Sequence, residues 1–115
     1  MREIRPTSVR VFGIVVDIEY VSEIEDCLGT FDPSTLKIQV LDGLPAENTL
    51  LVLWHELCHV VESLLEVKIS EAGICAFSTG FIQIMRDNPE LAAWSFGRRA
   101  GHTPPIPSIS DESLG

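Results

Sequence analysis

Two histidines four residues apart, His55 and His59, are the residues whose types and spacing best fit a chemical role in this chain. Together with Glu56 they form the pattern His-Glu-x-x-His. Successive helix residues are rotated by about 100°, so positions four apart lie about 40° apart on one face. Both imidazoles can therefore reach one metal ion, while Glu56 can contact a water bound to that ion. This is the arrangement that a zinc hydrolase requires.

The segment that carries this motif is expected to form a helix over about 45–66. Its apolar residues cover most of the circumference, and Pro45 suits the first turn. The polar exceptions form one stripe, which consists of His55, His59, Glu62 and Glu66. A helix that is buried on nearly all sides and open along one line predicts a cleft along that line. The same polar groups exclude a membrane span, although the stretch is long and apolar.

A zinc hydrolase needs a third protein ligand, and the fourth position is left to water. The downstream candidates are Glu62, Glu66 and Glu71. Glu62 lies about 4.5 Å further along the helix axis than His59, so three ligands on one helix would converge poorly. A second helix, expected over about 71–86, would bring Glu71 across the first. We therefore favour Glu71, and we interpret Glu62 and Glu66 as solvent-facing acids or as partners of a histidine.

Ordinary structural roles compete with each of these interpretations. Both histidines could simply be hydrogen-bonded side chains, and Glu71 could be an acid favoured by the dipole at a helix N-terminus. Cys58 and Cys75 are expected to pack in the core rather than to bind metal. The same core-packing role is expected of the two tryptophans, Trp54 and Trp94.

The remaining segments predict a small α+β domain. Residues 12–20 alternate between apolar and polar side chains, as a strand with one buried face does. Shorter strands are expected at 27–31 and 36–40, and the short connections favour a three-stranded antiparallel sheet. We expect this sheet to pack on the buried His-Glu-x-x-His helix and on the second helix.

The ends of the helices and of the domain have their own signals. Ser70 is a good N-cap for the second helix, and Asn88 followed by Pro89 predicts a short third helix that ends at Gly97. The predicted organisation is a flexible lead-in over 1–9, a single domain over 10–97 and a disordered Pro- and Ser-rich tail over 98–115.

Composition limits the partners and the compartment. The 115-residue chain has 8 Lys and Arg against 17 Asp and Glu, a net charge of −9, which argues against a nucleic-acid partner. Its 3 cysteines form no Cys-x-x-Cys pair, and no secretory signal pattern precedes them. We therefore expect a cytoplasmic protein with reduced thiols. The sequence indicates no particular oligomeric state.

The motif residues resemble the ligand region of gluzincin-type zinc metallopeptidases. The likeness is greatest to the short phage and prophage forms related to the ImmA/IrrE-type peptidases. It rests on the His-Glu-x-x-His motif and on the stretch from Glu71 to Phe77, extends over about 29–94, and includes the segment 85–91, Met-Arg-Asp-Asn-Pro-Glu-Leu. The resemblance implies a minimal zincin-like fold whose edge strand holds an extended peptide. The site residues that it implies are the zinc ligands His55, His59 and Glu71 and the general base Glu56.

The predicted function is the hydrolysis of a peptide bond in a peptide or protein substrate by a zinc-dependent metallopeptidase. One zinc ion would polarise the scissile carbonyl and lower the pKa of its water, and Glu56 would pass that water's proton to the leaving amine. The alternative is a metal-binding regulatory or interaction protein on the same scaffold with little or no turnover. The lack of a Tyr or His in a recognisable motif that could stabilise the oxyanion argues for this alternative. Tyr20 and His102 could do so, but neither lies in such a motif.

A third hypothesis is a latent peptidase whose tail lies in its own cleft. The residues that would then occupy the open position on the metal are His102, Asp111 or Glu112.

Overall fold

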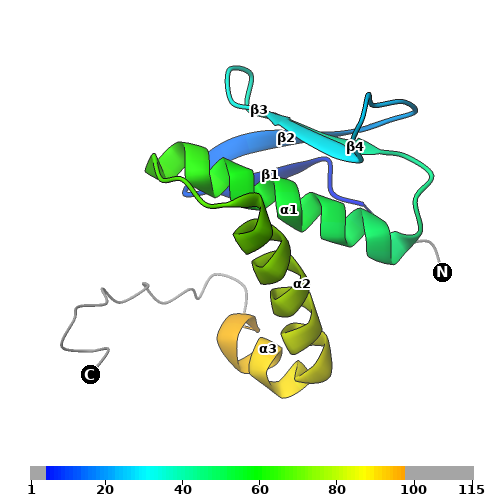
Figure 1. The fold of residues 1–115 in the computed structure, drawn as a ribbon. Coiled ribbons are helices and arrows are strands. Elements are labelled where there is room, and N and C mark those ends of the chain that lie inside the picture. The colour runs from blue at the N-terminus through cyan, green and yellow to red at the C-terminus, as the bar shows by residue number, and fades with distance from the viewer. Residues whose placement is uncertain (1–4, 98–115) are drawn as a thin grey trace. The chain divides into compact units, whose positions relative to one another are not determined.

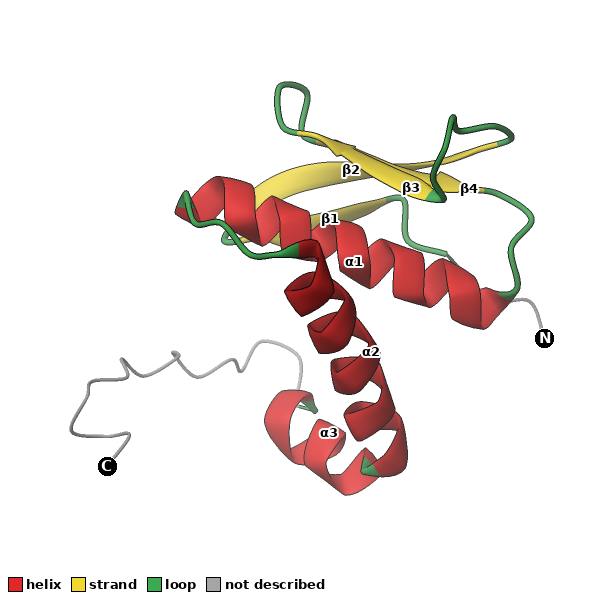
Figure 2. Ribbon diagram, viewed as in Figure 1, coloured by secondary structure: helices red, strands yellow, loops and turns green. Residues whose placement is uncertain are grey.

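The computed structural model describes residues 5–97, which form an α+β fold with one mixed four-stranded sheet and three helices (Figures 1 and 2). The predicted tail, including His102, Asp111 and Glu112, lies outside the described residues, as does the start of the predicted lead-in. The described residues divide into two compact units, with the boundary between Gln83 and Ile84. The first unit contains the sheet and all the residues of the candidate site.

The sheet has the strand order β1-β2-β4-β3. The pairs β1–β2 and β3–β4 are antiparallel, whereas β2 and β4 are parallel. The prediction of three antiparallel strands was therefore wrong in the number of strands and in one of the pairings. The strands are β1 (Ser8–Val11), β2 (Ile14–Val21), β3 (Gly29–Asp32) and β4 (Lys37–Leu41).

A hairpin turn replaces the start of the single strand predicted from Phe12. Phe12 and Gly13 have φ values of 52° and 79° between β1 and β2. Two consecutive positive φ values are typical of a type I′ turn, whose twist matches that of an antiparallel hairpin. β1 consequently begins at Ser8, inside the predicted lead-in, and pairs with β2 from Val11 opposite Ile14 to Ser8 opposite Asp17.

The parallel pairing of β2 with β4 follows from the path of the chain over 22–36. This segment passes the position of β4, forms the edge strand β3 and returns through a hairpin. Asp32 stabilises that hairpin by accepting hydrogen bonds from the backbone and hydroxyl of Ser34, at 2.9 and 2.7 Å. The whole segment thus serves as the long crossover that parallel strands need.

The helices lie close to their predicted positions. They are α1 (Ala46–Leu65), α2 (Glu71–Asp87) and α3 (Pro89–Phe96). Ser70 caps α2 as predicted, because its Oγ accepts the backbone N–H of Gly73 at 3.0 Å. Asn88 makes no side-chain cap for α3; its amide instead donates to the carbonyl of Ile84 in α2, at 2.9 Å. None of the helices in the described part of the chain is long and apolar enough to cross a membrane.

The core of the first unit forms where α1 lies across one face of the sheet (Figure 2). Burying an aliphatic side chain of this kind stabilises the fold by about 1.5–3 kcal/mol. The buried residues are Val16, Ile18, Ile38 and Val40 from the sheet and Leu53 and Val60 from α1.

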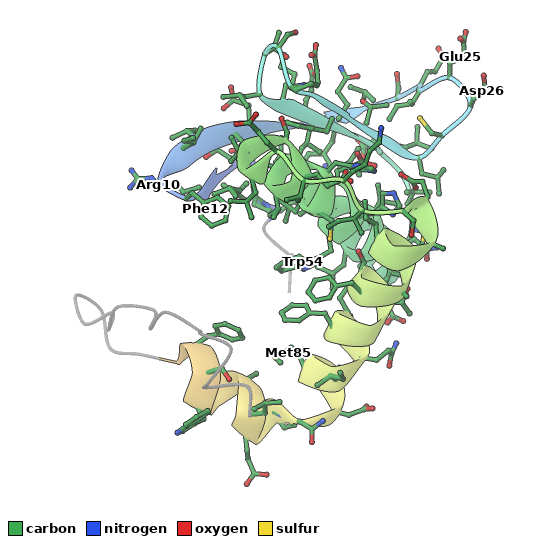
Figure 3. All side chains as sticks on the ribbon, turned by 60° about the vertical axis from the view of Figure 1, so that its left-hand side comes forward. Arg10, Phe12, Glu25, Asp26, Trp54 and Met85 are labelled. Atoms are coloured by element: carbon green, nitrogen blue, oxygen red, sulfur yellow. The ribbon has the colours of Figure 1, made fainter. Side chains whose placement is uncertain are left out.

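The tryptophans differ from each other in their packing. Trp54 of α1, labelled in Figure 3, packs on Phe81 of α2 with 5.0 Å between ring centroids. Phe81 in turn stacks on Phe77. Trp94 of α3 is 73% exposed, so its predicted role as a core residue was wrong.

Candidate metal centre

Three side chains from two helices converge at the start of α2. His55 and His59 extend from successive turns of α1, and Glu71 is the first residue of α2. The Nε2 atom of His55 lies 3.1 Å from Glu71 Oε2, and the Nε2 atom of His59 lies 2.9 Å from Glu71 Oε1. One atom from each of the three side chains can be chosen so that all lie within 4.8 Å of one another.

This donor set fits a divalent metal in chemistry and in spacing. Ligands held about 2.1 Å from a tetrahedral zinc ion are separated from one another by about 3.4 Å. The observed separations of 3.1 and 2.9 Å run from the two histidines to different oxygens of Glu71, and atoms chosen one from each side chain lie within 4.8 Å of one another. Two imidazoles and a carboxylate suit zinc and also other divalent first-row ions. These three residues could therefore hold such an ion.

Glu56 is the buried acid of the site. α1 is less buried than its sequence predicts, with Leu53, Glu56 and Val60 as its buried residues, and Glu56 is only 7% exposed. Burial raises the pKa of its carboxyl group, and the charge of Glu71 adds to this effect, while the two neighbouring histidines oppose it. A carboxylate with a raised pKa is a stronger base toward a neighbouring water.

Glu62 contacts His59 from the side opposite to Glu71. Its Oε1 lies 2.7 Å from His59 Nδ1, and its Oε2 accepts the backbone N–H of Ile69 at 2.6 Å. The hydrogen bond from the Ile69 N–H has the largest effect on the pKa of Glu62 and lowers it, and the hydrogen bond with His59 lowers it further. Glu62 is therefore a partner of a histidine, one of the two roles that the sequence left open for it. Glu66 ends α1 in the left-handed conformation and is exposed.

His59 has a carboxylate on each of its ring nitrogens. Its burial lowers the pKa of the imidazole, but the hydrogen bond with Glu62 and the charges of Glu56, Glu71 and Glu62 more than offset this, so the pKa is raised overall. In the absence of a metal, both ring N–H groups can donate to carboxylates. A divalent ion at Nε2 would take the place of one of these protons.

Cys75 lies beside the other histidine. Its Sγ is 3.7 Å from His55 Nδ1, and its side chain is exposed rather than packed in the core, so that prediction was wrong. Cys58 is half-buried, and its Sγ lies 3.6 Å from the hydroxyl of Ser78. Cys75 follows Glu71 by one turn of α2, and this spacing was the sequence signal for its proximity to the site.

An open cleft of about 970 Å³ is lined by the three converging side chains, and also by Glu56, Glu62 and Cys75. It lies along α1, and its other walls come from β3 with its flanking loops, from the connection between α1 and α2, and from the first turns of α2. Val67 and Lys68 of the connection line it, although the sequence pattern gave no signal for either. Lys68 is the only Lys or Arg among the described residues that line this cleft. Tyr20 does not contribute, because its hydroxyl donates to the carbonyl of Pro6, at 2.8 Å.

Gly29 brings the edge strand β3 against the buried acid. A Cβ added at Gly29 would lie 2.5 Å from Val52 Cγ1 and 3.2 Å from Glu56 Cγ. Only a residue without a side chain allows the strand and the helix to approach this closely. The sequence predicted a strand over 27–31 that includes Gly29, but it did not predict this contact, since the contact depends on how the sheet packs on α1.

The backbone of β3 is open along its outer edge. The N–H of Leu41 donates to the carbonyl of Leu28 at 2.9 Å, so Leu28 and Leu41 form a hydrogen-bonded pair. In an antiparallel ladder these pairs alternate with pairs that are not hydrogen-bonded. By this alternation, the pairs Gly29–Val40 and Phe31–Ile38 are not hydrogen-bonded to each other. The backbone N–H and C=O groups of Gly29 and Phe31 therefore point away from β4. Both residues line the cleft.

Comparison with known proteins gives no match: no protein-family model fits the chain, and no curated protein or solved structure is significantly similar to it.

Proposed function

We propose that this protein is a zinc-dependent metallopeptidase, a minimal zincin related to the short phage-type enzymes that its motif resembles. One observation carries the proposal: Glu71 reaches the Nε2 atoms of both His55 and His59. The buried acid Glu56 lies between these two histidines in the sequence of α1. A zinc ion held by these three residues would polarise a scissile carbonyl and lower the pKa of an attacking water.

The residues of the chain have separate tasks in this reaction. Glu56 takes the proton of the attacking water and passes it to the leaving amine, and its raised pKa favours the first of these transfers. The peptide lies extended along β3, where the outward N–H and C=O groups of Gly29 and Phe31 can pair with its backbone. Lys68, as the cation of the cleft, is the candidate to stabilise the oxyanion.

The free cysteines support a reducing compartment for this enzyme. Cys27, Cys58 and Cys75 are all unpaired. Free thiols persist in the cytoplasm, and we propose that the protein works there.

The experiment that tests this function compares the wild-type protein with Glu56→Gln. The amide keeps the shape of the side chain but cannot take a proton, so hydrolysis of a cleavable peptide should fall by at least about 10²-fold. The zinc content of the purified protein should stay the same, because Glu56 is not among the three ligands. Full activity in Glu56→Gln would contradict the mechanism, and a wild-type protein without stoichiometric metal under zinc-replete conditions would contradict the zinc site.

The second candidate is a metal-binding regulatory or interaction protein that keeps this scaffold with little or no turnover. It is favoured by the cleft lining, in which the only Tyr or His side chains among the described residues are the two candidate ligands. If this candidate is correct, the protein binds zinc with the same residues. Glu56→Gln and the wild type should then show equal zinc content and equally little peptide hydrolysis.

A further inference from the structure

Glu62 uses its two carboxylate oxygens for two different parts of the site. Oε1 is hydrogen-bonded to the ring of His59, at 2.7 Å, and Oε2 to the backbone N–H of Ile69, at 2.6 Å. Ile69 lies in the connection between α1 and α2, two residues before Glu71. The Glu62 side chain is only 15% exposed, so water competes weakly for either bond.

The backbone of Glu62 also belongs to this connection. Its carbonyl accepts the N–H of Glu66, at the end of α1, and the N–H of Val67, at 3.1 Å. These bonds end the helix in the left-handed conformation at Glu66 and turn the chain toward α2. The turn that leaves α1 and the segment that leads to Glu71 are therefore both hydrogen-bonded to one residue.

We propose that Glu62 is a positioning residue that couples metal binding by His59 to the ordering of the connection that delivers Glu71. The inference rests on the metal-binding part of the proposed function. Because a carboxylate is planar and rigid, a shift of the His59 ring moves both of its oxygens. A hydrogen bond at Nδ1 also keeps Nε2 directed at Glu71, where the metal would be bound.

Such coupling is reciprocal. If the bond from Glu62 to Ile69 helps to hold His59 and Glu71 in place for a metal, the metal must stabilise the bond to Ile69 by the same free energy. The connection should therefore be better ordered in the metal-loaded protein than in the metal-free protein, and only while residue 62 carries a carboxylate.

The first experiment measures zinc affinity by competition with a chromogenic chelator for the wild type, Glu62→Gln, Glu62→Ala and Glu66→Ala. Loss of a carboxylate that orients a ligand typically weakens metal binding by about 10–100-fold, which is the loss expected for Glu62→Ala. Glu62→Gln keeps one oxygen acceptor, but its NH₂ group cannot accept a hydrogen bond, so an intermediate loss is expected. Glu66→Ala removes a nearby charge of the same sign and should bind zinc as the wild type does.

The second experiment follows amide hydrogen exchange by NMR with and without zinc. Zinc should slow the exchange of the Ile69 amide at least threefold in the wild type and in Glu66→Ala, and should leave it unchanged in Glu62→Ala. The amide of Val60, in the buried part of α1, should remain protected in every variant. This comparison separates positioning from a general loss of the fold, which would expose Ile69 and Val60 together.

Two results would overturn the inference by itself: equal zinc affinity in Glu62→Ala and the wild type, or equal slowing of Ile69 exchange in both proteins. A wild-type protein that binds no zinc would overturn the inference and the proposed function together. The outcomes therefore distinguish the two proposals.

Discussion

Glu71 combines a central position in the site with high exposure. Its carboxylate contacts both histidines, yet 68% of its side-chain surface faces solvent. Ion pairs that are this exposed contribute at most about 1 kcal/mol to stability. Its contribution should therefore be seen in metal binding rather than in the folding of the metal-free protein.

The variant Glu71→Ala tests this separation. We expect its zinc affinity to fall by more than about 100-fold, since the loss of a ligand should exceed the loss of a residue that only orients one. The metal-free variant should unfold within about 1 kcal/mol of the metal-free wild type, because only exposed contacts are lost. Chelator competition and urea unfolding measure the two quantities. A larger loss of zinc in Glu62→Ala than in Glu71→Ala would move the third ligand to Glu62.

For individual residues of the site, the sequence predicts those contacts that follow from the geometry of a single helix. The convergence of His55 and His59 follows from their spacing alone, and the choice of Glu71 followed from the poor convergence of three ligands on one helix. The bond between Glu62 and Ile69 and the exposure of Cys75 could not be predicted, because both depend on the path between two helices.

Among the elements, β3 and α1 are joined most closely at Gly29. We expect Gly29→Ala to force these two elements apart, because the new Cβ would meet Val52 at 2.5 Å and Glu56 at 3.2 Å. Overpacking of this kind costs about 1–3 kcal/mol of unfolding free energy. Under the proposed function peptide hydrolysis should fall as well, since both Glu56 and the strand proposed to hold the peptide would be displaced. Urea unfolding and a peptide-cleavage assay measure the two effects.

The matched control for this change is Gly80→Ala. A Cβ at Gly80, within α2, would meet no atom within 4 Å. Alanine in a helix interior stabilises it by about 0.5–1 kcal/mol relative to glycine, so this variant should be slightly more stable and fully active. If Gly29→Ala resembled Gly80→Ala in both assays, the close contact between β3 and α1 would have no role in the site.

The helices were predicted better than the sheet, for reasons that lie in the chain itself. A helix such as α1 is specified by local periodicity and end signals, and its bounds followed from them. The β1–β2 turn also had a local signal, Gly13, but the alternation of apolar residues through Phe12 obscured it. The parallel pairing of β2 with β4 had none, because it depends on where β3 lies in the sheet.

For the molecule as a whole, zinc should act as a stabilising ligand of the fold. A metal held by α1 and α2 would bind the native state only, so it would stabilise the fold by about 2.7 kcal/mol when free zinc is 100 times its dissociation constant. Thermal unfolding with saturating zinc, compared with unfolding in a chelator, should therefore show a higher transition temperature. The increase should be much smaller for Glu71→Ala, and an equal increase in both proteins would place the stabilising metal elsewhere.

The β1–β2 hairpin offers a handle for engineering this protein. Its tip carries Phe12, which is 65% exposed and held at a positive φ that an aromatic side chain tolerates poorly (Figure 3). β1 is the sheet edge opposite to β3, so a dye or surface linker attached at Phe12 would leave the cleft accessible. Asn at this position would give the Asn-Gly pair that such turns favour. The hairpin is thus a suitable site for attaching a reporter with which the proposed peptide binding can be measured.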